Sequence, residues 1–206
     1  MNPSRYPVAV LVSGGGTNLQ AILDAQGEPR FASEVVVVIS DRPSVKALDR
    51  ARTSGIAATV VSWDDSPDRV TFSSAICDEA DRHGAAALVL AGFMRVLSPG
   101  AIERFPNRII NVHPALLPAF PGARSVPEAL EYGVTVTGVT VHFVDEEVDH
   151  GPIIIQEAVA VLLDDDAVTL HARLQEVEHR LLPQVVDALG RGSLHVDGRR
   201  VTWVGR

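Results

Sequence analysis

The sequence has a single cysteine, Cys77, among its 206 residues. An internal disulfide is therefore excluded, and the chain fits a reducing compartment. The sequence also lacks an apolar run long enough to span a membrane. Residues 1–7 lack the apolar core of a signal peptide. We therefore expect a cytoplasmic protein without a membrane partner.

Basic residues are fewer than acidic ones. The chain has 18 Lys and Arg against 26 Asp and Glu, which gives a formal net charge of −8. This balance argues against nucleic acid as a main partner. A hydrophobic content of 46% over 206 residues is enough for one domain with a sizeable core. We expect small-molecule partners, and the sequence leaves both a monomer and a homodimer open.

Apolar runs alternate with stretches of helical spacing along the first half of the chain. Strands are expected at residues 8–12, 34–40, 58–61 and 86–90, with helices at 19–23, 45–54 and 68–82. This alternation predicts an α/β fold with a doubly wound, mostly parallel sheet of the Rossmann-like kind and helices on both faces. Ligands of such sheets bind beyond the carboxyl ends of the strands.

The second half predicts antiparallel strands toward the C-terminus. Strands are expected at residues 135–144 and from 153, a short helix at 126–132, and a terminal hairpin at 194–203 that turns at Asp197-Gly198. The longest helical stretch covers residues 169–190, and Pro183 within it predicts a kink or a break.

A stretch from Asn111 to Gly122 follows Arg108-Ile109-Ile110, whose apolar isoleucines predict a short buried strand. Residues two apart on a strand point to the same side, so Asn111 and His113 should project together. Pro114 then ends the strand because proline has no N–H to donate. A neutral amide beside an imidazole suits acyl transfer. The alternative is that both side chains only satisfy loop backbone groups.

A glycine-rich turn, residues 13–18, lies between the first strand and the first helix. Such a turn can bring backbone N–H groups and a helix N-terminus to a phosphate. It does not match the dinucleotide fingerprint, because Leu19 stands where a glycine is needed, and the P-loop lysine is absent. A plain turn capped by Thr17 or Asn18 remains the alternative.

The string N-V-H-P-A-L-L-P-A-F-P-G at residues 111–122 resembles the signature of the folate-dependent formyltransferases, N-[IV]-H-P-S-L-L-P-x-[FY]-x-G. Its Phe-Pro-Gly ending is similar to that of the family's purine-pathway members. The resemblance implies transfer of a formyl group from 10-formyltetrahydrofolate, the co-substrate, to the amine of phosphoribosylglycinamide (GAR), without a metal. It also implies that Asn111 and His113 stabilise an oxyanion while Asp149 orients His113 and moves a proton.

Three further strings extend this resemblance over nearly the whole chain. They are S-G-x-G-[ST]-N-L-Q at the glycine turn, A-G-[FY]-M-R-[IV]-L at residues 91–97 and T-V-H-F-V-x-x-x-x-D-x-G-P at residues 140–152. For GAR, the family implies contacts from Gly16, Thr17, Asn18, Pro114, Gln175 and Glu178. For folate, it implies contacts from Phe93, Met94, Arg95, Val96, Leu97, Val144, Asp145, Glu146, Glu147 and Asp149. Asp145, Glu146 and Glu147 are otherwise expected on the surface.

The resemblance implies one formyltransferase domain over residues 1–206, with a phosphate-binding half at 1–100 and a folate-binding, catalytic half at 101–206. This sequence departs from the family pattern at Ala115, where serine is common. It departs again at residues 122–126, where many relatives carry histidines and where Arg124 could bind phosphate.

Other functions fit the sequence less well. We expect neither the tRNA-binding domain of methionyl-tRNA formyltransferase nor the length of a bifunctional sugar formyltransferase. Formyltetrahydrofolate hydrolase has a second histidine where Pro114 stands. The alternatives kept are that hydrolase, another small N-formyltransferase, and a nucleotide-binding Rossmann-like domain, which lacks the expected acid about 20 residues after its glycines. A zinc hydrolase is disfavoured because H-E-x-x-H and H-x-x-E-H are absent.

Overall fold

A mixed nine-stranded sheet runs through the computed structural model, which describes residues 5–205. Its strand order is β3-β2-β1-β4-β5-β6-β7-β9-β8. Neighbouring strands from β3 to β5 pair in parallel, and β5, β6 and β7 pair antiparallel. The predicted fold class is confirmed. The strands are β1 Tyr6–Val12, β2 Ser33–Ser40, β3 Ala57–Val60, β4 Ala87–Leu90, β5 Ile109–His113, β6 Val136–Phe143, β7 Ile153–Ala160, β8 Leu194–Asp197 and β9 Arg200–Trp203.

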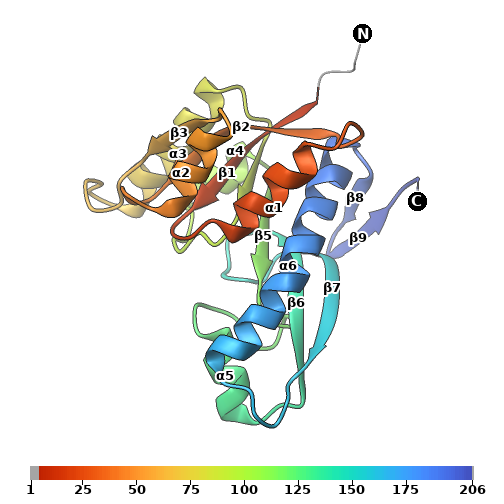
Figure 1. Cartoon of the computed structure of the whole chain (residues 1–206). Coiled ribbons are helices and arrows are strands. Elements are labelled where there is room, and N and C mark those ends of the chain that lie inside the picture. The colour runs from red at the N-terminus through yellow and green to blue at the C-terminus, as the bar shows by residue number, and fades with distance from the viewer. Residues whose placement is uncertain (1–4, 206) are drawn as a thin grey trace.

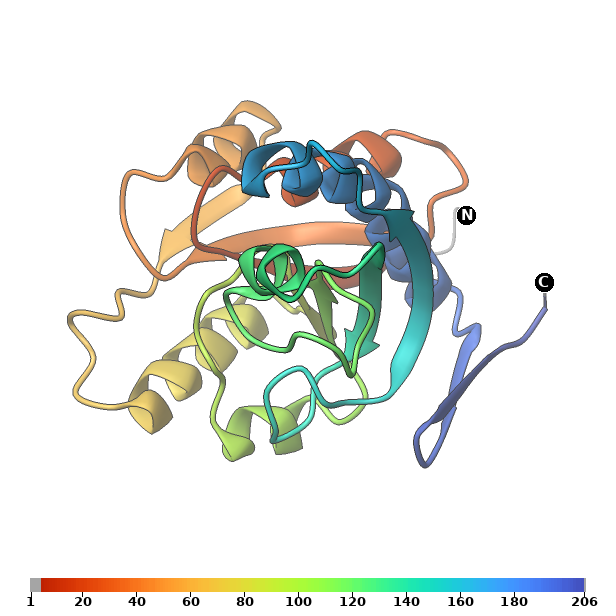
Figure 2. The ribbon, with the colours of Figure 1, turned by 90° about the horizontal axis from the view of Figure 1, so that it is seen from below.

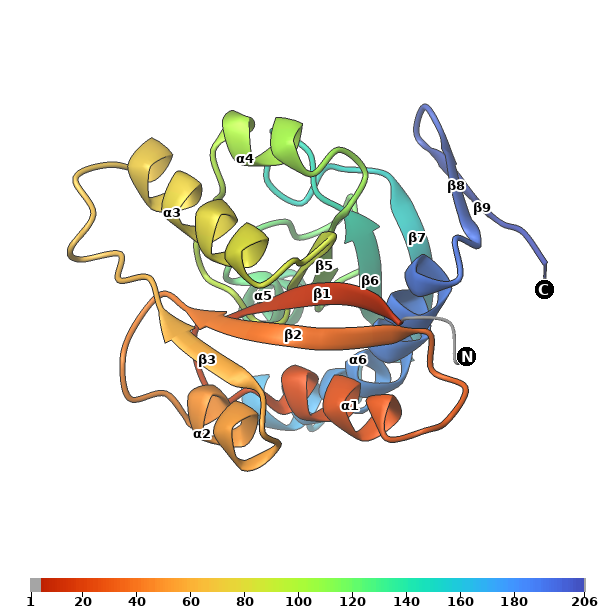
Figure 3. The ribbon, with the colours of Figure 1, turned by 90° about the horizontal axis from the view of Figure 1, so that it is seen from above.

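Helices cover both faces of the sheet. Figure 3 shows α3 and α4 on one face, and α1, α2 and α6 on the other. The helices are α1 Thr17–Gln26, α2 Lys46–Thr53, α3 Arg69–Arg82, α4 Pro99–Arg104, α5 Ser125–Tyr132 and α6 Ala167–Gly190. Figure 1 shows α5 beside the first turns of α6, below the parallel strands.

The central strand β1 is buried on both faces. Val8, Val10 and Val12 belong to the core under α1 and α6, whereas Ala9 and Leu11 belong to the core under α3. Successive strand residues point to opposite faces, so a fully apolar run is what a strand between two helical layers requires. Strand order reverses between β1 and β4, and the turns after both strands lie at this switch point.

Two helical features differ from expectation. The short helix α4 was not predicted, although Ser98-Pro99 is a common helix start because proline suits the first helical position. The predicted break at Pro183 is not present, because α6 continues from Ala167 to Gly190. Buried residues on both sides of Pro183, among them Leu182 and Val185, pack this part of α6 into the core, and such packing outweighs the poor helix propensity of proline.

The C-terminal hairpin of β8 and β9 is confirmed, with Asp197 pairing with Arg200 across the turn. Figure 2 shows it extending away from the rest of the chain beside β7. Among the helices of residues 5–205, none has the length and apolar character that a membrane crossing requires.

Candidate active site

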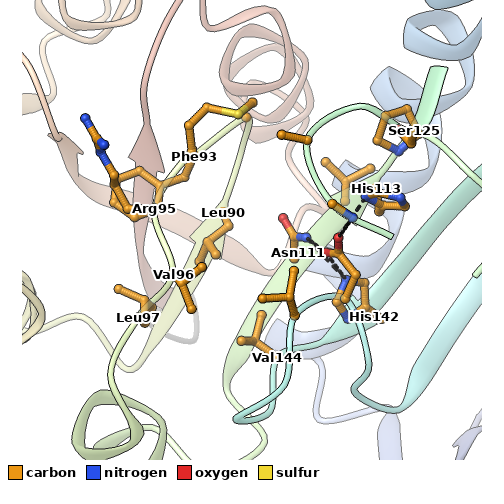
Figure 4. Close-up of a pocket in the computed structure, with 18 of the residues that line it drawn as sticks. Leu90, Phe93, Arg95, Val96, Leu97, Asn111, His113, Ser125, His142 and Val144 are labelled. Carbon is orange, nitrogen blue, oxygen red and sulfur yellow. Dashed lines mark hydrogen bonds and ion pairs between the residues drawn. The ribbon is translucent and has the colours of Figure 1, made fainter. Parts of the chain in front are cut away.

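A pocket opens between three segments of the chain: the turn after β4, the end of β5 with its following loop, and the loop between β6 and β7. Figure 4 shows the first segment facing the other two across the pocket. The residues predicted from the sequence that line it are Phe93, Met94, Arg95, Val96, Leu97, Asn111, His113, Pro114, Val144, Asp145, Glu147 and Asp149.

Asn111 and His113 stand two apart on β5, as predicted, and both line the pocket. β5 lies where the sheet changes from parallel to antiparallel. Asn111 pairs with Leu90 of β4 on one side and with His142 of β6 on the other. Because directly opposed residues share a face of the sheet, the Asn111 amide meets the His142 ring, with 3.2 Å between Nδ2 and Nε2.

Asp149 joins this cluster from the loop between β6 and β7. Its Oδ1 accepts a hydrogen bond from Asn111 Nδ2 at 3.2 Å. Its Oδ2 accepts one from the Gly122 N–H at 2.7 Å and lies 3.3 Å from His113 Nδ1. The predicted convergence of Asn111, His113 and Asp149 is therefore present, although 38 positions separate Asn111 from Asp149.

The surroundings of Asp149 favour its carboxylate form. Burial raises its pKa, but the His142 ring, the Gly122 N–H and the charge of His113 together outweigh burial and hold the pKa below the ordinary value. Asp149 is therefore an ionised acceptor near neutral pH.

His113 is 4% exposed and faces an oxygen acceptor at each ring nitrogen. Nε2 lies 2.8 Å from the Phe120 carbonyl, and Nδ1 faces Asp149. A carbonyl oxygen only accepts, so Nε2 carries a proton. The ring is thereby fixed in orientation, with Nδ1 directed at the Asp149 carboxylate.

His142 belongs to the same cluster, and the sequence reasoning gave it no role. Its Nδ1 lies 2.8 Å from the Phe143 carbonyl and must donate to it. Its Nε2 lies 3.2 Å from Asn111 Nδ2 and 3.7 Å from Asp149 Oδ1. The two N–H bonds of the Asn111 amide are thus directed at His142 and Asp149. The position of His142 within T-V-H-F-V could have identified it as a site residue. Its place opposite Asn111 depends on the pairing register of β5 and β6, which the spacing of residues in the sequence does not give.

The glycine turn adjoins the pocket wall. Ser13 accepts a hydrogen bond from the Met94 N–H through its hydroxyl at 2.9 Å, and its own N–H donates to Gly92 O at 3.2 Å. Gly16 has φ +71° and is the N-cap of α1, so neither Thr17 nor Asn18 caps the helix. A Cβ on Gly16 would come within 2.6 Å of the Ala47 Cβ, so both space and conformation demand glycine here.

Asn18 and Glu178 form a buried pair behind this turn. The Asn18 amide donates to Glu178 Oε2 at 2.7 Å, and the two residues are 7% and 4% exposed. Gln175 lies one helical turn earlier, at a separate pocket between α5 and α6. Of the residues expected to contact GAR, Pro114 lines the first pocket. Gly16, Thr17, Asn18, Gln175 and Glu178 are not among its lining residues.

Two side chains predicted to contact folate, those of Glu146 and Arg95, do not point into the pocket. Glu146 is exposed and does not line it. The Arg95 side chain leaves the pocket, as Figure 4 shows: its Nε donates to Asp41 at 2.8 Å and its guanidinium lies 4.8 Å from the centre of the Trp63 ring. Arg124 is exposed and pairs with Glu131 at 3.2 Å.

The chemistry of the pocket is that of an acyl-transfer site. An amide donor and an imidazole stand beside an ionised carboxylate, and a mostly apolar wall faces them, an arrangement that can bind a flat heterocycle. Within the described part of the chain, no group of three or more His, Cys, Asp or Glu side chains is arranged to hold a metal ion.

Comparison with known proteins agrees with this class of site. Residues 6–186 match the family described as formyl transferase, and the chain belongs to that family.

The relatives named as phosphoribosylglycinamide formyltransferases are similar over almost their whole length. That of Mycobacterium tuberculosis is 43% identical over 97% of this chain and 91% of its own. The crystal structure of glycinamide ribonucleotide transformylase 1 from Symbiobacterium toebii superposes with a TM-score of 0.94, at 45% identity, over 97% of this chain and 94% of that one.

Longer relatives are also similar. The trifunctional purine biosynthetic protein adenosine-3 of Bos taurus is 39% identical over 99% of this chain, which spans only 20% of that protein's length.

Proposed function

We propose that this formyltransferase moves the formyl group of 10-formyltetrahydrofolate to the amine of GAR, in purine biosynthesis. The observation that carries the proposal is the meeting of Asn111, His113 and Asp149 at one pocket, with His113 Nδ1 3.3 Å from Asp149 Oδ2. The family likeness and the full-length similarity to GAR formyltransferases support the same acceptor.

In the proposed reaction, the GAR amine attacks the formyl carbon and forms a tetrahedral oxyanion. Asn111 then exchanges one of its two hydrogen bonds, to His142 or to Asp149, for a bond to that oxyanion. The His113 ring adds a second stabilising group. Asp149 accepts the proton that the attacking amine loses, and this proton passes to the folate nitrogen as the C–N bond to the donor breaks.

The folate is proposed to occupy the pocket between residues 93–97 and residues 144–149. The apolar side chains of Val96 and Val144 line this pocket, and the turn after β4 can offer backbone N–H and C=O groups to the edge of the ring. We propose that Arg95 contributes through its backbone, because its guanidinium is paired with Asp41.

The GAR phosphate is proposed to bind at the glycine turn, where Gly16, Thr17 and Asn18 present the N-terminus of α1. Glu178, with Gln175 one turn away, is proposed to face the glycinamide part. The hydrogen bond from Asn18 to Glu178 supports this placement, because it connects the proposed phosphate site with the proposed amine site.

We further propose small-molecule partners without nucleic acid, a cytoplasmic location, and one domain with its phosphate site in residues 1–100 and its catalytic residues in 101–206. The formal charge of −8 supports the first of these. Residues 93–97 of the proposed folate pocket belong to the first half and Glu178 to the second, so both halves contribute to both substrates.

The test is whether the folate loses its formyl group only when GAR is present. Purified protein is mixed with 10-formyltetrahydrofolate, with and without GAR, and folate deformylation and free formate are followed. We expect deformylation only with GAR and no formate. Formate release at a comparable rate without GAR would identify a hydrolase and refute the proposed acceptor.

A further inference from the structure

The loop that carries Asp149, residues 144–151, holds a backbone conformation that needs external support. Asp149 has φ +53°, in the left-handed region that residues with a side chain rarely adopt. Two residues later the chain is pressed against the sheet: a Cβ on Gly151 would collide with the Phe143 carbonyl oxygen. The loop has little freedom at this end, and Asp149 occupies its least favourable position.

Side-chain hydrogen bonds within the loop connect its beginning to its end. The Asp145 carboxylate accepts hydrogen bonds from the Glu147 N–H at 3.1 Å and from His150 Nδ1 at 2.7 Å. Asp145 was expected to be a solvated surface residue, yet its carboxylate links the beginning of the loop to its end. His150, the residue after Asp149, is thereby tied to the far side of the loop.

A second tie comes from outside the loop. Arg199, in the turn between β8 and β9, donates through Nη2 to the His150 carbonyl at 2.6 Å. Its Nη1 lies 3.3 Å from His150 Nε2. Nη1 also lies 3.4 Å from His150 Nδ1, so the guanidinium contacts both ring nitrogens. The same guanidinium thus contacts the backbone and the ring of His150.

The hairpin that presents Arg199 is itself anchored to the sheet. β9 pairs with β7 at Arg200 and Ile153. Trp203 donates through Nε1 to the Ile154 carbonyl at 3.2 Å, and Val201 packs against the core. Arg199 therefore connects a fixed part of the molecule to the residue that follows Asp149.

We propose that Arg199 is a positioning residue for the formyl-transfer reaction, and that the C-terminal hairpin supports the active site through this residue. Arg199 holds the His150 backbone so that Asp149 keeps its left-handed conformation and its contacts with Gly122, Asn111 and His113. The expected change in kcat rests on the function proposed above, whereas the expected change in the loop conformation does not.

The size of the effect is limited because Arg199 and His150 are exposed, and solvent weakens such contacts. The backbone bond matters most, because it is short, has a charged donor and acts next to the strained residue. Small displacements of a catalytic group can lower a rate up to about a hundredfold. In a protein without the Arg199 guanidinium, Asp149 should still occupy its position part of the time, so we expect a decrease in kcat of about tenfold.

The experiment compares Arg199→Ala and Arg199→Lys with Arg200→Ala, a control that removes the same charge from the neighbouring position. Each full-length variant is assayed for kcat, for KM with GAR, and for amide hydrogen exchange of residues 144–151 without substrates. Arg199→Ala should lower kcat about tenfold, leave KM for GAR within about twofold, and speed exchange in the loop about tenfold. Arg199→Lys should recover part of both effects, since lysine can still donate to the His150 carbonyl.

Three results would overturn the proposal: unchanged exchange in the loop, faster exchange with an unchanged kcat, or equal effects of Arg199→Ala and Arg200→Ala. The two proposals fail separately. If the wild-type protein transfers no formyl group to GAR, the proposed acceptor is wrong, while the exchange data still decide whether Arg199 fixes the loop.

Discussion

Replacing Asp149 by asparagine tests the arrangement of the site at its centre. The carboxylate accepts hydrogen bonds at both oxygens: Oδ2 from the Gly122 N–H at 2.7 Å and Oδ1 from the Asn111 amide at 3.2 Å. An asparagine has one oxygen and one NH₂ group. Whichever way it is turned, its NH₂ faces another donor, so one existing hydrogen bond is lost and one donor is left without a partner.

Two magnitudes follow from this geometry. One unmet buried donor costs about 1–3 kcal/mol in the free energy of unfolding. Loss of a positioned proton-transfer group costs about 10²–10⁴-fold in rate. Folate affinity should change much less, because the apolar wall at residues 93–97 is untouched.

The stability difference should also depend on pH. The pKa of Asp149 in the folded protein lies below its ordinary value, despite the opposing effect of burial. The ionised form therefore stabilises the fold above the unfolded-state pKa, and this contribution is lost as the pH falls through the folded-state pKa. Wild type and Asp149→Asn should become more similar in stability as the pH is lowered.

The assay is single-turnover formyl transfer, combined with the folate Kd and urea unfolding at several pH values. Glu146→Gln is the matched control, because it removes an exposed charge from the same loop and its side chain does not line the pocket. Near-full turnover of Asp149→Asn would refute the catalytic assignment of Asp149, and so would an equal loss in both variants.

Three other substitutions test separate parts of the structure. Glu178→Gln should raise the KM for GAR with little change in folate affinity, because the pair it forms lies behind the glycine turn; equal weakening of both would make Glu178 structural. Thr140→Val removes a fully buried hydroxyl that bonds two backbone groups of the loop after β5. Urea unfolding should show a free energy of unfolding lower by about 1–3 kcal/mol, and the exposed control Thr202→Val should show almost no change. The Arg173 guanidinium lowers the pKa of Asp165 to about 2. Asp165 therefore stabilises the fold above about pH 4, and this contribution is lost as the pH falls toward 2. In Asp165→Asn the free energy of unfolding should depend less on pH in that window, and an unchanged pH dependence would contradict the pairing.

Local patterns in the sequence were sufficient where a structural rule acts over few residues. The i, i+2 spacing on a strand placed Asn111 and His113 on one side of β5, and proline chemistry ended that strand at Pro114. Alternating strands and helices gave the parallel part of the sheet. The turn at Asp197-Gly198 gave the terminal hairpin.

Contacts between distant segments were not available from local patterns. The pairing register of β5 and β6 places His142 against Asn111, and nothing in either segment alone specifies it. Asp145 resembles a solvated acid, and its role in closing the loop depends on where His150 lies. The unbroken α6 depends on burial on both sides of Pro183, which helix propensity does not describe. The location of Asp149 was predicted only through the family resemblance.

The hydrogen bond between Asn18 and Glu178 has a consequence for folding during synthesis of the chain. It joins residues 160 positions apart, and it depends on α6 packing beside α1. A chain leaves the ribosome from its N-terminus, so β1 and its neighbours emerge long before this helix does. Until then the side chains of Val8, Val10 and Leu19 lack the cover that α6 gives them. A nascent or truncated chain that ends before residue 167 therefore exposes an apolar sheet face, as chains that need chaperones do.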